Sequence, residues 1–518
     1  METSQRQVAR AAALVMAAFA VSRLLGLVRQ VVFGAYFGTG AEMDAYVAAV
    51  RIPDAIFLVV AGGALGSAFI PLFTGRLARQ QTEAAWRLGS AIITILTVAL
   101  VPISLICVLT APWLIRVVVA PALPAAVQIR TVALMRVMLI SPTIFGISGI
   151  AMGILNAHQH FLLPALAPIV YNVGLIGGAI WGGLTPAGAM GPAVGMVVGA
   201  AAHLMVQVPG LVRYGAAFRP TLGLSDPGVR EVGLLIMPRM LAMGAAQVNV
   251  IVINNLASRL GPGAISSLNY AYLMMMLPQG VFAQAVGTAA FPTFSQQAAL
   301  GRTEELARTL TNALRTLIAL TVPASVGMVL LGEPLVALMF QRGAFDAAAT
   351  RVVAATLAYF AVGLVGHSAL EVLGRAFYAL HDTWTPAMAA IAGLVLNGLL
   401  GLALPGLLER LGLVPLGGLA LAIALAALVE MSILFVLIRR RLGGFAARAL
   451  VLTTTRVALA SVGMALVLWV LKSVGPQPVL LQAAVGVSAG VLVYAALAWL
   501  LGVDQLRYAV RTVISQVR

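Results

Sequence analysis

The chain has 518 residues, of which 61% are apolar and only 9% are charged, and its mean hydropathy is +1.02. A water-soluble domain carries roughly 25% charged residues, so this composition excludes an ordinary soluble protein. The net charge of +16 comes from basic residues spread singly over the chain, which argues against a nucleic-acid partner. The single cysteine, Cys107, excludes an internal disulfide and a cysteine-based metal centre.

Long uncharged runs define the fold class. No Asp, Glu, Lys or Arg occurs between Arg136 and Arg213 or between Arg259 and Arg302. A helix needs about 20 apolar residues to cross a bilayer, and a backbone in lipid must satisfy its own hydrogen bonds, which leaves helices or a closed barrel. Barrel strands alternate apolar and polar residues, and these runs do not. The sequence therefore predicts an all-α polytopic membrane protein.

In chain order, the apolar segments number fourteen. The first could be taken for a secretory signal, but its apolar sequence continues to Phe37, so we interpret it as a transmembrane helix. The fourteen predicted helices lie near residues 8–36, 43–74, 88–113, 131–157, 162–183, 190–211, 230–258, 263–297, 311–332, 350–380, 385–407, 413–438, 452–471 and 478–502.

The loops differ in positive charge. The chain has 32 Lys and Arg residues. When the loops are assigned alternately to the two sides of the membrane, the loops of one side hold 19 of them and the loops of the other side hold 7, and the remaining six lie within the predicted helices. Cytoplasmic loops carry the excess of positive charge. The sequence therefore predicts a multi-pass protein of the cytoplasmic (inner) membrane with both termini in the cytoplasm.

An internal repeat organises these helices. Residues 153–164 and 375–386 share a pattern, an apolar helix that ends in a turn before a proline, and Ala157 and Ala379 occupy the same place in the two copies. Each copy contains six helices. Because this number is even, both copies enter the membrane from the same side, which indicates a parallel repeat. We predict an N-terminal six-helix bundle (1–215), a second six-helix bundle (216–445), and two additional helices with a cytoplasmic tail (446–518).

Arginines inside the predicted helices are the candidate functional residues. An arginine at the bilayer centre costs about 2.5–3.5 kcal/mol on insertion scales, so it usually faces a wet cavity. Guanidinium groups bind phosphate oxygens through a fork of donors, and the excess of arginine over acid predicts an anionic substrate. Alternatively, these arginines reach the lipid headgroups or pair with Asp44, Asp54 or Glu371. The six are Arg23, Arg29, Arg51, Arg136, Arg239 and Arg375.

The sequence contains no phosphate-binding glycine loop with lysine, no cluster with metal-ligand spacing and no Ser/His/Asp arrangement. It therefore predicts neither an enzyme nor an ATPase, and no cofactor.

A series of short motifs occurs in order between about residues 20 and 400, and together they resemble the MurJ/MviN family of lipid II flippases. The resemblance implies fourteen helices of the multidrug/oligosaccharidyl-lipid/polysaccharide flippase superfamily, a central cationic cavity, and a groove for the lipid tail in the last two helices. The motifs are Ser22–Gly26 with Arg29, Phe37-Gly38 with Asp44-Ala45, Arg51–Pro53, Gly63–Pro71, Gly153–Ala157, Leu163–Pro168 with Asn172, Gln247–Asn249, Leu277–Gly280 with Pro292–Ser295, Arg342–Phe345 and Arg375–Pro386.

The resemblance also assigns roles to single residues. Arg23 and Arg29 match cavity arginines, Arg51 stands at a position that is usually basic, and Asp44 matches a residue near the periplasmic gate. Arg239, after Pro238, is our candidate for a compensating substrate-binding arginine. Compensation is needed because the chain departs from the family pattern at Gln30, Phe57, Leu58, Gly62, Ile253 and Leu273.

The function implied is translocation of lipid II, a sugar-peptide linked to undecaprenyl pyrophosphate, to the outer leaflet by alternating access. Since the chain has no ATP motif, the membrane potential or an ion gradient would drive it. Two alternatives stay open: a related exporter of polysaccharide-linked lipids or other amphiphiles, and a non-transporting scaffold of cell-wall synthesis proteins.

Overall fold

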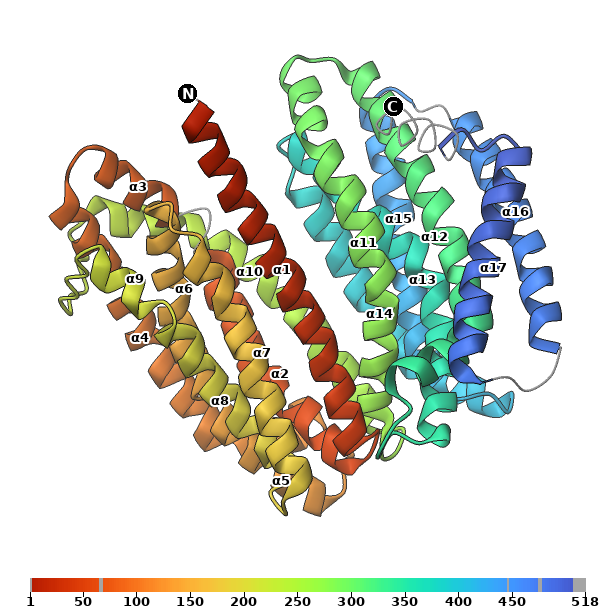
Figure 1. Ribbon diagram of the computed structural model, residues 1–518, viewed down its shortest axis with the longest axis horizontal. Helices are drawn as coiled ribbons and strands as arrows, with labels where there is room; N and C mark the ends of the chain where they lie inside the picture. Colours follow the sequence, from red (N-terminus) through yellow and green to blue (C-terminus); the bar gives the residue numbers. More distant parts are fainter. Residues whose placement is uncertain (1, 65–68, 445–446, 474–477, 506–518) are drawn as a thin grey trace. The chain divides into compact units, whose positions relative to one another are not determined.

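The computed structural model describes residues 2–64, 69–444, 447–473 and 478–505, without the side chains of 2–14, 60–64, 237–239, 241–242, 245 and 447. Over these ranges the regular structure is helical throughout, which confirms the predicted all-α fold (Figure 1). The helices are α1 (Glu2–Phe37), α2 (Ala41–Ala64), α3 (Ile70–Ala78), α4 (Thr82–Trp113) with its π-helical continuation η2 (Leu114–Val119), α5 (Ala125–Met138), α6 (Ser141–Ala157), α7 (Leu162–Leu184), α8 (Met190–Met205), α9 (Val208–Arg213), α10 (Pro227–Ser258), α11 (Ala264–Ala299), α12 (Thr303–Phe340), α13 (Ala347–Ala379), α14 (Trp384–Arg410), α15 (Leu416–Arg441), α16 (Ala447–Ser473) and α17 (Val479–Leu500).

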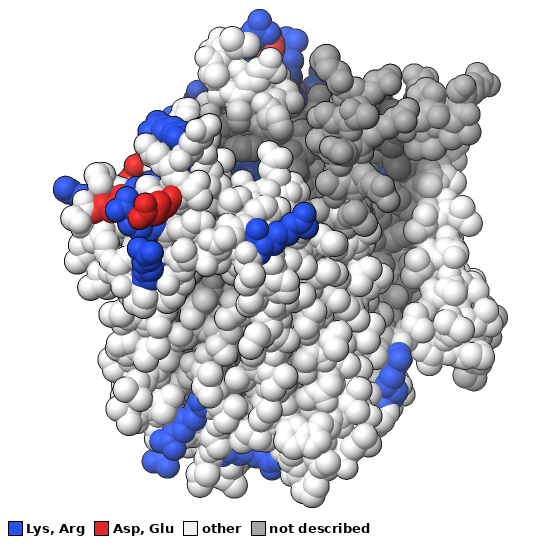
Figure 2. Space-filling model, turned by 60° about the vertical axis from the view of Figure 1, so that its left-hand side comes forward, with Lys and Arg blue, Asp and Glu red and all other residues white. Residues whose placement is uncertain are grey.

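Twelve segments of the described chain are long and apolar enough to cross a membrane, and each overlaps one of the fourteen predicted helices. Of the other two predicted helices, 43–74 covers α2 and the start of α3, which are separate helices in the structure, and 230–258 corresponds to α10. Both α2 and α10 include residues whose side chains are not described. Figure 2 shows charged side chains toward the upper and lower ends of the visible face, with a broad uncharged belt between them. The chain is therefore a multi-pass membrane protein.

Packing divides the chain into two compact units. Unit 1 comprises Met1–Ser266 and Gly343–Phe345, and unit 2 comprises Ser267–Arg342 and Asp346–Arg518. Helix α10 belongs to unit 1 because it packs against α2. The predicted division at residues 215 and 445 follows the sequence repeat rather than this packing, and it stays a prediction.

The internal repeat is visible in the helix boundaries. Helices α4 and α12 begin at Thr82 and Thr303, and α6 and α13 end at Ala157 and Ala379, so nearly the same offset in sequence separates both pairs. Helices α6 and α13 are each followed by a left-handed residue, Gln159 or His381, with a φ of 57°. In both turns the next amide donates a hydrogen bond of 2.9 Å to a carbonyl five residues back, which closes the same type of helix end.

Two neighbouring helices of unit 1, α7 and α8, pack with their backbones in contact. Small residues at every fourth position allow such an approach between membrane helices. A Cβ atom added to Gly178 of α7 would lie 2.5 Å from the Gly191 carbonyl oxygen and 2.7 Å from the Gly195 Cα. The glycines that form this contact are Gly174, Gly178 and Gly182 of α7 and Gly191, Gly195 and Gly199 of α8.

We expect Gly178→Val to destabilise unit 1, because the valine side chain would overlap the backbone of α8. Overpacking of this kind costs about 1–3 kcal/mol, which the midpoint of thermal unfolding in detergent measures. Gly177→Val is the matched control, since a Cβ at the exposed Gly177 meets no atom within 4 Å. Equal midpoints for the two variants would contradict the close contact.

In unit 2 the last two helices pack on α12 (Figure 1). The Tyr494 hydroxyl of α17 donates a 2.6 Å hydrogen bond to the Ala319 carbonyl of α12, and Val457 and Met464 of α16 are buried in the same cluster. Helices α16 and α17 are therefore part of this unit's core packing.

Candidate functional site

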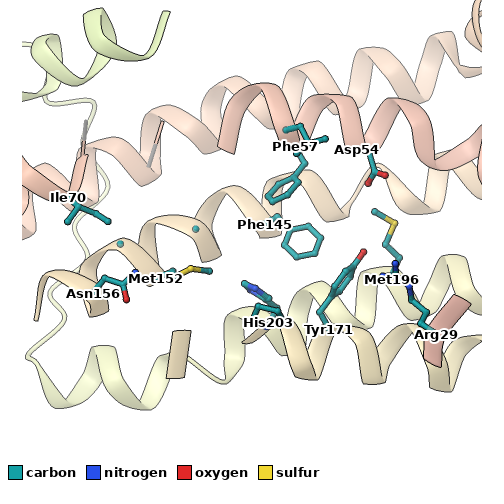
Figure 3. A pocket seen from close by; sticks show the side chains of 14 residues that line it. Arg29, Asp54, Phe57, Ile70, Phe145, Met152, Asn156, Tyr171, Met196 and His203 are labelled. Carbon is teal, nitrogen blue, oxygen red and sulfur yellow. The ribbon is translucent and has the colours of Figure 1, made fainter. Parts of the chain in front are cut away.

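Unit 1 contains a cavity of about 560 Å³ between α1, α2, α6, α7 and α8, with Ile70 of α3 at its edge. Figure 3 shows polar side chains at one end, where Arg29, Asp54 and Tyr171 lie together. Met152 and Asn156 lie at the other end with Ile70, and the rings of Phe57 and Phe145 lie between the two ends.

Arg29 is held in the cavity wall by α7. Its Nη1 donates a 3.1 Å hydrogen bond to Oδ1 of Asn172. The Asn172 amide is itself oriented, because its Nδ2 donates to the Pro168 carbonyl one turn earlier at 2.9 Å. Asn172 is buried, so this pair fixes α1 to α7 within the membrane and leaves the rest of the guanidinium toward the cavity.

Asp54 follows Pro53 in α2 and supplies the negative charge of the same cavity. It is half-buried, and the positive charges of Arg51 and Arg29 both act on it. In Figure 3 its carboxylate points toward Tyr171 and Met196. Asp54 is the only acidic residue among those that line the cavity in the described part of the chain.

Aromatic rings form the middle of the cavity wall. The centroids of Phe57 and Phe145 are 4.9 Å apart, and the Phe145 ring meets those of Tyr171 and His203 nearly edge-on at 5.0 and 5.5 Å. Such arrangements are favourable for aromatic pairs. The middle of the cavity wall is therefore largely aromatic and lies next to the charged end.

Behind the ring wall, a buried polar cluster fixes His203. Its Nδ1 lies 2.7 Å from the Ser148 hydroxyl, and Nε2 of Gln207 donates to that hydroxyl at 2.8 Å. Gln207 Nε2 also donates to the His203 carbonyl at 2.9 Å. The cluster connects α6 to α8 and holds the imidazole edge at the cavity.

The other predicted binding arginines lie elsewhere. Arg51 is half-buried, and its Nε donates a 3.3 Å hydrogen bond to Oδ1 of Asn254 on α10. Asn254 in turn donates to the Val119 carbonyl at 3.1 Å. Arg23 is predicted to lie at the cavity with Arg29, but it is exposed and does not line this cavity, because it lies six residues, about 240° of helix rotation, from Arg29 on α1. The side chain of Arg239 lies outside the described residues.

Asp44, predicted to lie at a gate, is fully buried at the first turn of α11. Its Oδ2 accepts a 2.6 Å hydrogen bond from the Gly263 amide, and its Oδ1 accepts bonds from the amide and hydroxyl of Ser266 at 2.8 and 2.7 Å. All three donors belong to unit 1. Asp44 thus caps a helix that begins far later in the sequence, and the amide dipoles there favour a carboxylate.

Two of the six candidate arginines bond within the protein away from the cavity. Arg375 of unit 2 pairs with Glu371 one turn away at 2.8 Å and also donates to Gln284. Arg136 is exposed and donates to the Val108 carbonyl at 3.2 Å. Neither lines the unit 1 cavity.

Three cavity residues are not predicted from the sequence. Asp54 is expected there only as a partner for an arginine, and Tyr171 and His203 are not among the candidates. The available signal is the motif Leu163–Pro168 with Asn172, since Tyr171 directly precedes that asparagine. His203 carries no signal of its own, because a single histidine in a glycine-rich helix is more often a packing residue.

The comparisons with known sequences all indicate the same family. The family model described as lipid II flippase MurJ matches residues 33–485. A protein named lipid II flippase MurJ from Burkholderia cenocepacia is 31% identical over 434 residues, covering 81% of this chain and 82% of its own. A probable lipid II flippase MurJ from Bdellovibrio bacteriovorus is 28% identical and covers 98% of this chain and 97% of its own.

Solved structures show the same fold. A lipid II flippase MurJ in an inward closed conformation matches with a TM-score of 0.79 at 24% identity, covering 95% of this chain and 99% of that chain. An inward-facing multidrug resistance transporter of the MATE family, from the MOP superfamily, matches with a TM-score of 0.69 at 14% identity, covering 83% and 98%.

Proposed function

The chain belongs to the lipid II flippase MurJ family, and from that premise we propose that it moves lipid II from the cytoplasmic to the outer leaflet by alternating access. The observation that carries the proposal is Arg29, a guanidinium fixed by Asn172 in the wall of an intramembrane cavity. Such a group binds the pyrophosphate of the headgroup, while the undecaprenyl tail stays in lipid.

The other predicted residues are also assigned roles in the proposed transport. Arg51 lies one turn before Asp54 and adds positive charge close to the cavity. Arg23 and Arg239 are proposed to contact the headgroup in other states of the cycle, and Asp44 is proposed to hold the gate. The membrane potential or an ion gradient, rather than ATP, supplies the energy.

We further propose that the protein lies in the inner membrane and cooperates with cell-wall synthesis proteins. The 19-to-7 charge bias predicts that both termini face the cytoplasm. A reporter active only in the periplasm should be silent when fused after Arg518 and active when fused in the loop between α12 and α13. Strong activity after Arg518 would contradict the count of fourteen spans.

Depletion tests the function. When the protein is depleted in its own host, lipid II should accumulate on the cytoplasmic side, and the wild-type gene should reverse the accumulation. Accumulation of another polyprenyl-linked saccharide would instead favour the polysaccharide-lipid exporter. If precursor levels stay normal while cell-wall enzymes lose their location, the scaffold function would be favoured.

A further inference from the structure

The unit 1 cavity holds a carboxylate that has no hydrogen-bond partner in the described structure. Asp54 is half-buried, lines the cavity and accepts no hydrogen bond from a described residue. A charged group inside a protein normally has its hydrogen bonds satisfied. The free lone pairs of Asp54 therefore point to donors supplied by whatever fills the cavity.

The position of Asp54 next to Arg29 gives the cavity two opposite preferences. Arg29 attracts the oxygens of a diphosphate, whereas the negative charge of Asp54 repels them. A ligand that carries only a diphosphate therefore loses affinity at Asp54. A ligand that carries hydroxyl, amide N–H or ammonium groups beside the diphosphate regains it, because a carboxylate is a strong acceptor.

The wall beyond the charged end suits a sugar. The rings of Phe57, Phe145 and Tyr171 line the cavity directly beside Asp54 and Arg29. Flat apolar ring faces pack against the C–H faces of a pyranose, whose hydroxyl and amide groups at its rim need polar partners. The volume of about 560 Å³ is in the range of small-molecule sites.

We propose that Asp54 is a specificity-determining residue that favours glycosylated lipid diphosphates over bare ones. This inference rests on the proposed function and deepens it. Arg29 binds the diphosphate, Asp54 accepts hydrogen bonds from the first sugar, and the charge of Asp54 disfavours undecaprenyl diphosphate, which has no sugar. Discrimination by an unfavourable contact with the wrong ligand is a general route to specificity.

The test compares two ligands on the full-length protein in lipid nanodiscs. Dissociation constants for undecaprenyl diphosphate and for lipid II are measured on wild type and on Asp54→Asn. We expect the variant to bind undecaprenyl diphosphate about tenfold more tightly and lipid II more weakly, so that the preference for lipid II falls at least tenfold. A tenfold change in affinity corresponds to about 1.4 kcal/mol. Asp54→Glu should restore the preference.

Matched variants separate the outcomes. Glu42→Gln removes the same charge from the first turn of α2, far along the helix from the cavity, and should leave both constants unchanged. Asp54→Ser gives a second neutral variant if Asp54→Asn is recovered poorly. Equal shifts for both ligands, or none, would overturn the role of Asp54 but leave the proposed function intact. Wild-type protein that binds neither lipid would overturn the proposed function itself.

Discussion

Replacing Arg29 with alanine is expected to abolish complementation of a flippase-depleted strain while the protein still reaches the membrane. Arg29 is the only arginine or lysine among the residues that line the described unit 1 cavity. A hydrogen bond to a charged group contributes about 1.5–3 kcal/mol, so losing one lowers headgroup affinity roughly ten- to hundredfold. Loss of two such bonds, as in a forked contact with a diphosphate, would leave little binding.

Three further variants make the Arg29 result specific. Arg29→Lys is expected to fail as well, because a point ammonium lacks the planar fork of donors. Asn172→Ala should retain partial function, since it removes the support of Arg29 but not its charge. Arg136→Ala, which removes an exposed arginine outside the cavity, should complement fully. Full complementation by Arg29→Ala would show that its bond to Asn172 is structural only.

Replacing Asp44 with alanine is expected to be the most destabilising single change in this part of unit 1. It would leave two backbone amides and one hydroxyl without their acceptor, at the fully buried position that Asp44 now occupies. Each orphaned donor costs about 1–3 kcal/mol. The expected result is a large decrease in the midpoint of thermal unfolding in detergent.

A graded series tests this account of Asp44. Asp44→Asn keeps one oxygen and should lose chiefly the bond from Gly263, and Ser266→Ala removes only the hydroxyl donor. We therefore expect the midpoint of thermal unfolding to fall most for Asp44→Ala, less for Asp44→Asn and least for Ser266→Ala. Position 263 itself must stay glycine, since its φ is +84° and a Cβ there would lie 2.3 Å from the Thr39 carbonyl oxygen. An Asp44→Ala variant as stable as wild type would refute the capping role.

The gate role predicted for Asp44 has a separate readout. With Cys107→Ser as background, a cysteine at Thr39 reports access to the turn between α1 and α2. If Asp44 holds a gate, a membrane-impermeant thiol reagent should label Thr39→Cys faster in the Asp44→Ala variant than with Asp44 present. Unchanged labelling together with lower stability would limit Asp44 to the helix cap.

The fold is largely predictable from the sequence because hydrophobic length is a strong signal. An uncharged run that exceeds the length a bilayer requires specifies a membrane helix regardless of its neighbours, and the turn at residues 157–164 recurs at 379–386 with a left-handed residue in each copy. Packing between helices follows no such local rule. The contact between α10 and α2, for example, includes a hydrogen bond between Asn254 and Arg51, residues 203 positions apart.

The site is predictable only in part, for a physical reason. An arginine in lipid is costly enough to imply a role, and Arg29 is predicted on that ground. Asp54 is not predicted as a site residue, because an acid close to arginines in the sequence is expected to neutralise one of them. Only the structure places its carboxylate at the cavity, facing the ring of Tyr171 from α7. Likewise, Phe57 and Leu58, two of the positions where the chain departs from the family pattern, line the cavity and make its wall more apolar than a central cationic cavity implies.

The glycine contact between α7 and α8 limits how the cavity can change shape. Helices that touch through their backbones have no side chains between them to rearrange, and Cα–H groups can bond to the facing carbonyls. We therefore expect Tyr171 on α7 to keep its spacing from Met196 and His203 on α8. We therefore expect widening to admit a larger headgroup to come from the walls outside this pair, among them α2, which carries Asp54 and Phe57 and contains Pro53, a residue type that commonly bends helices. The close backbone contact thus predicts that the α7–α8 pair moves as one body during transport, and that α2, with its acid, can change position relative to it.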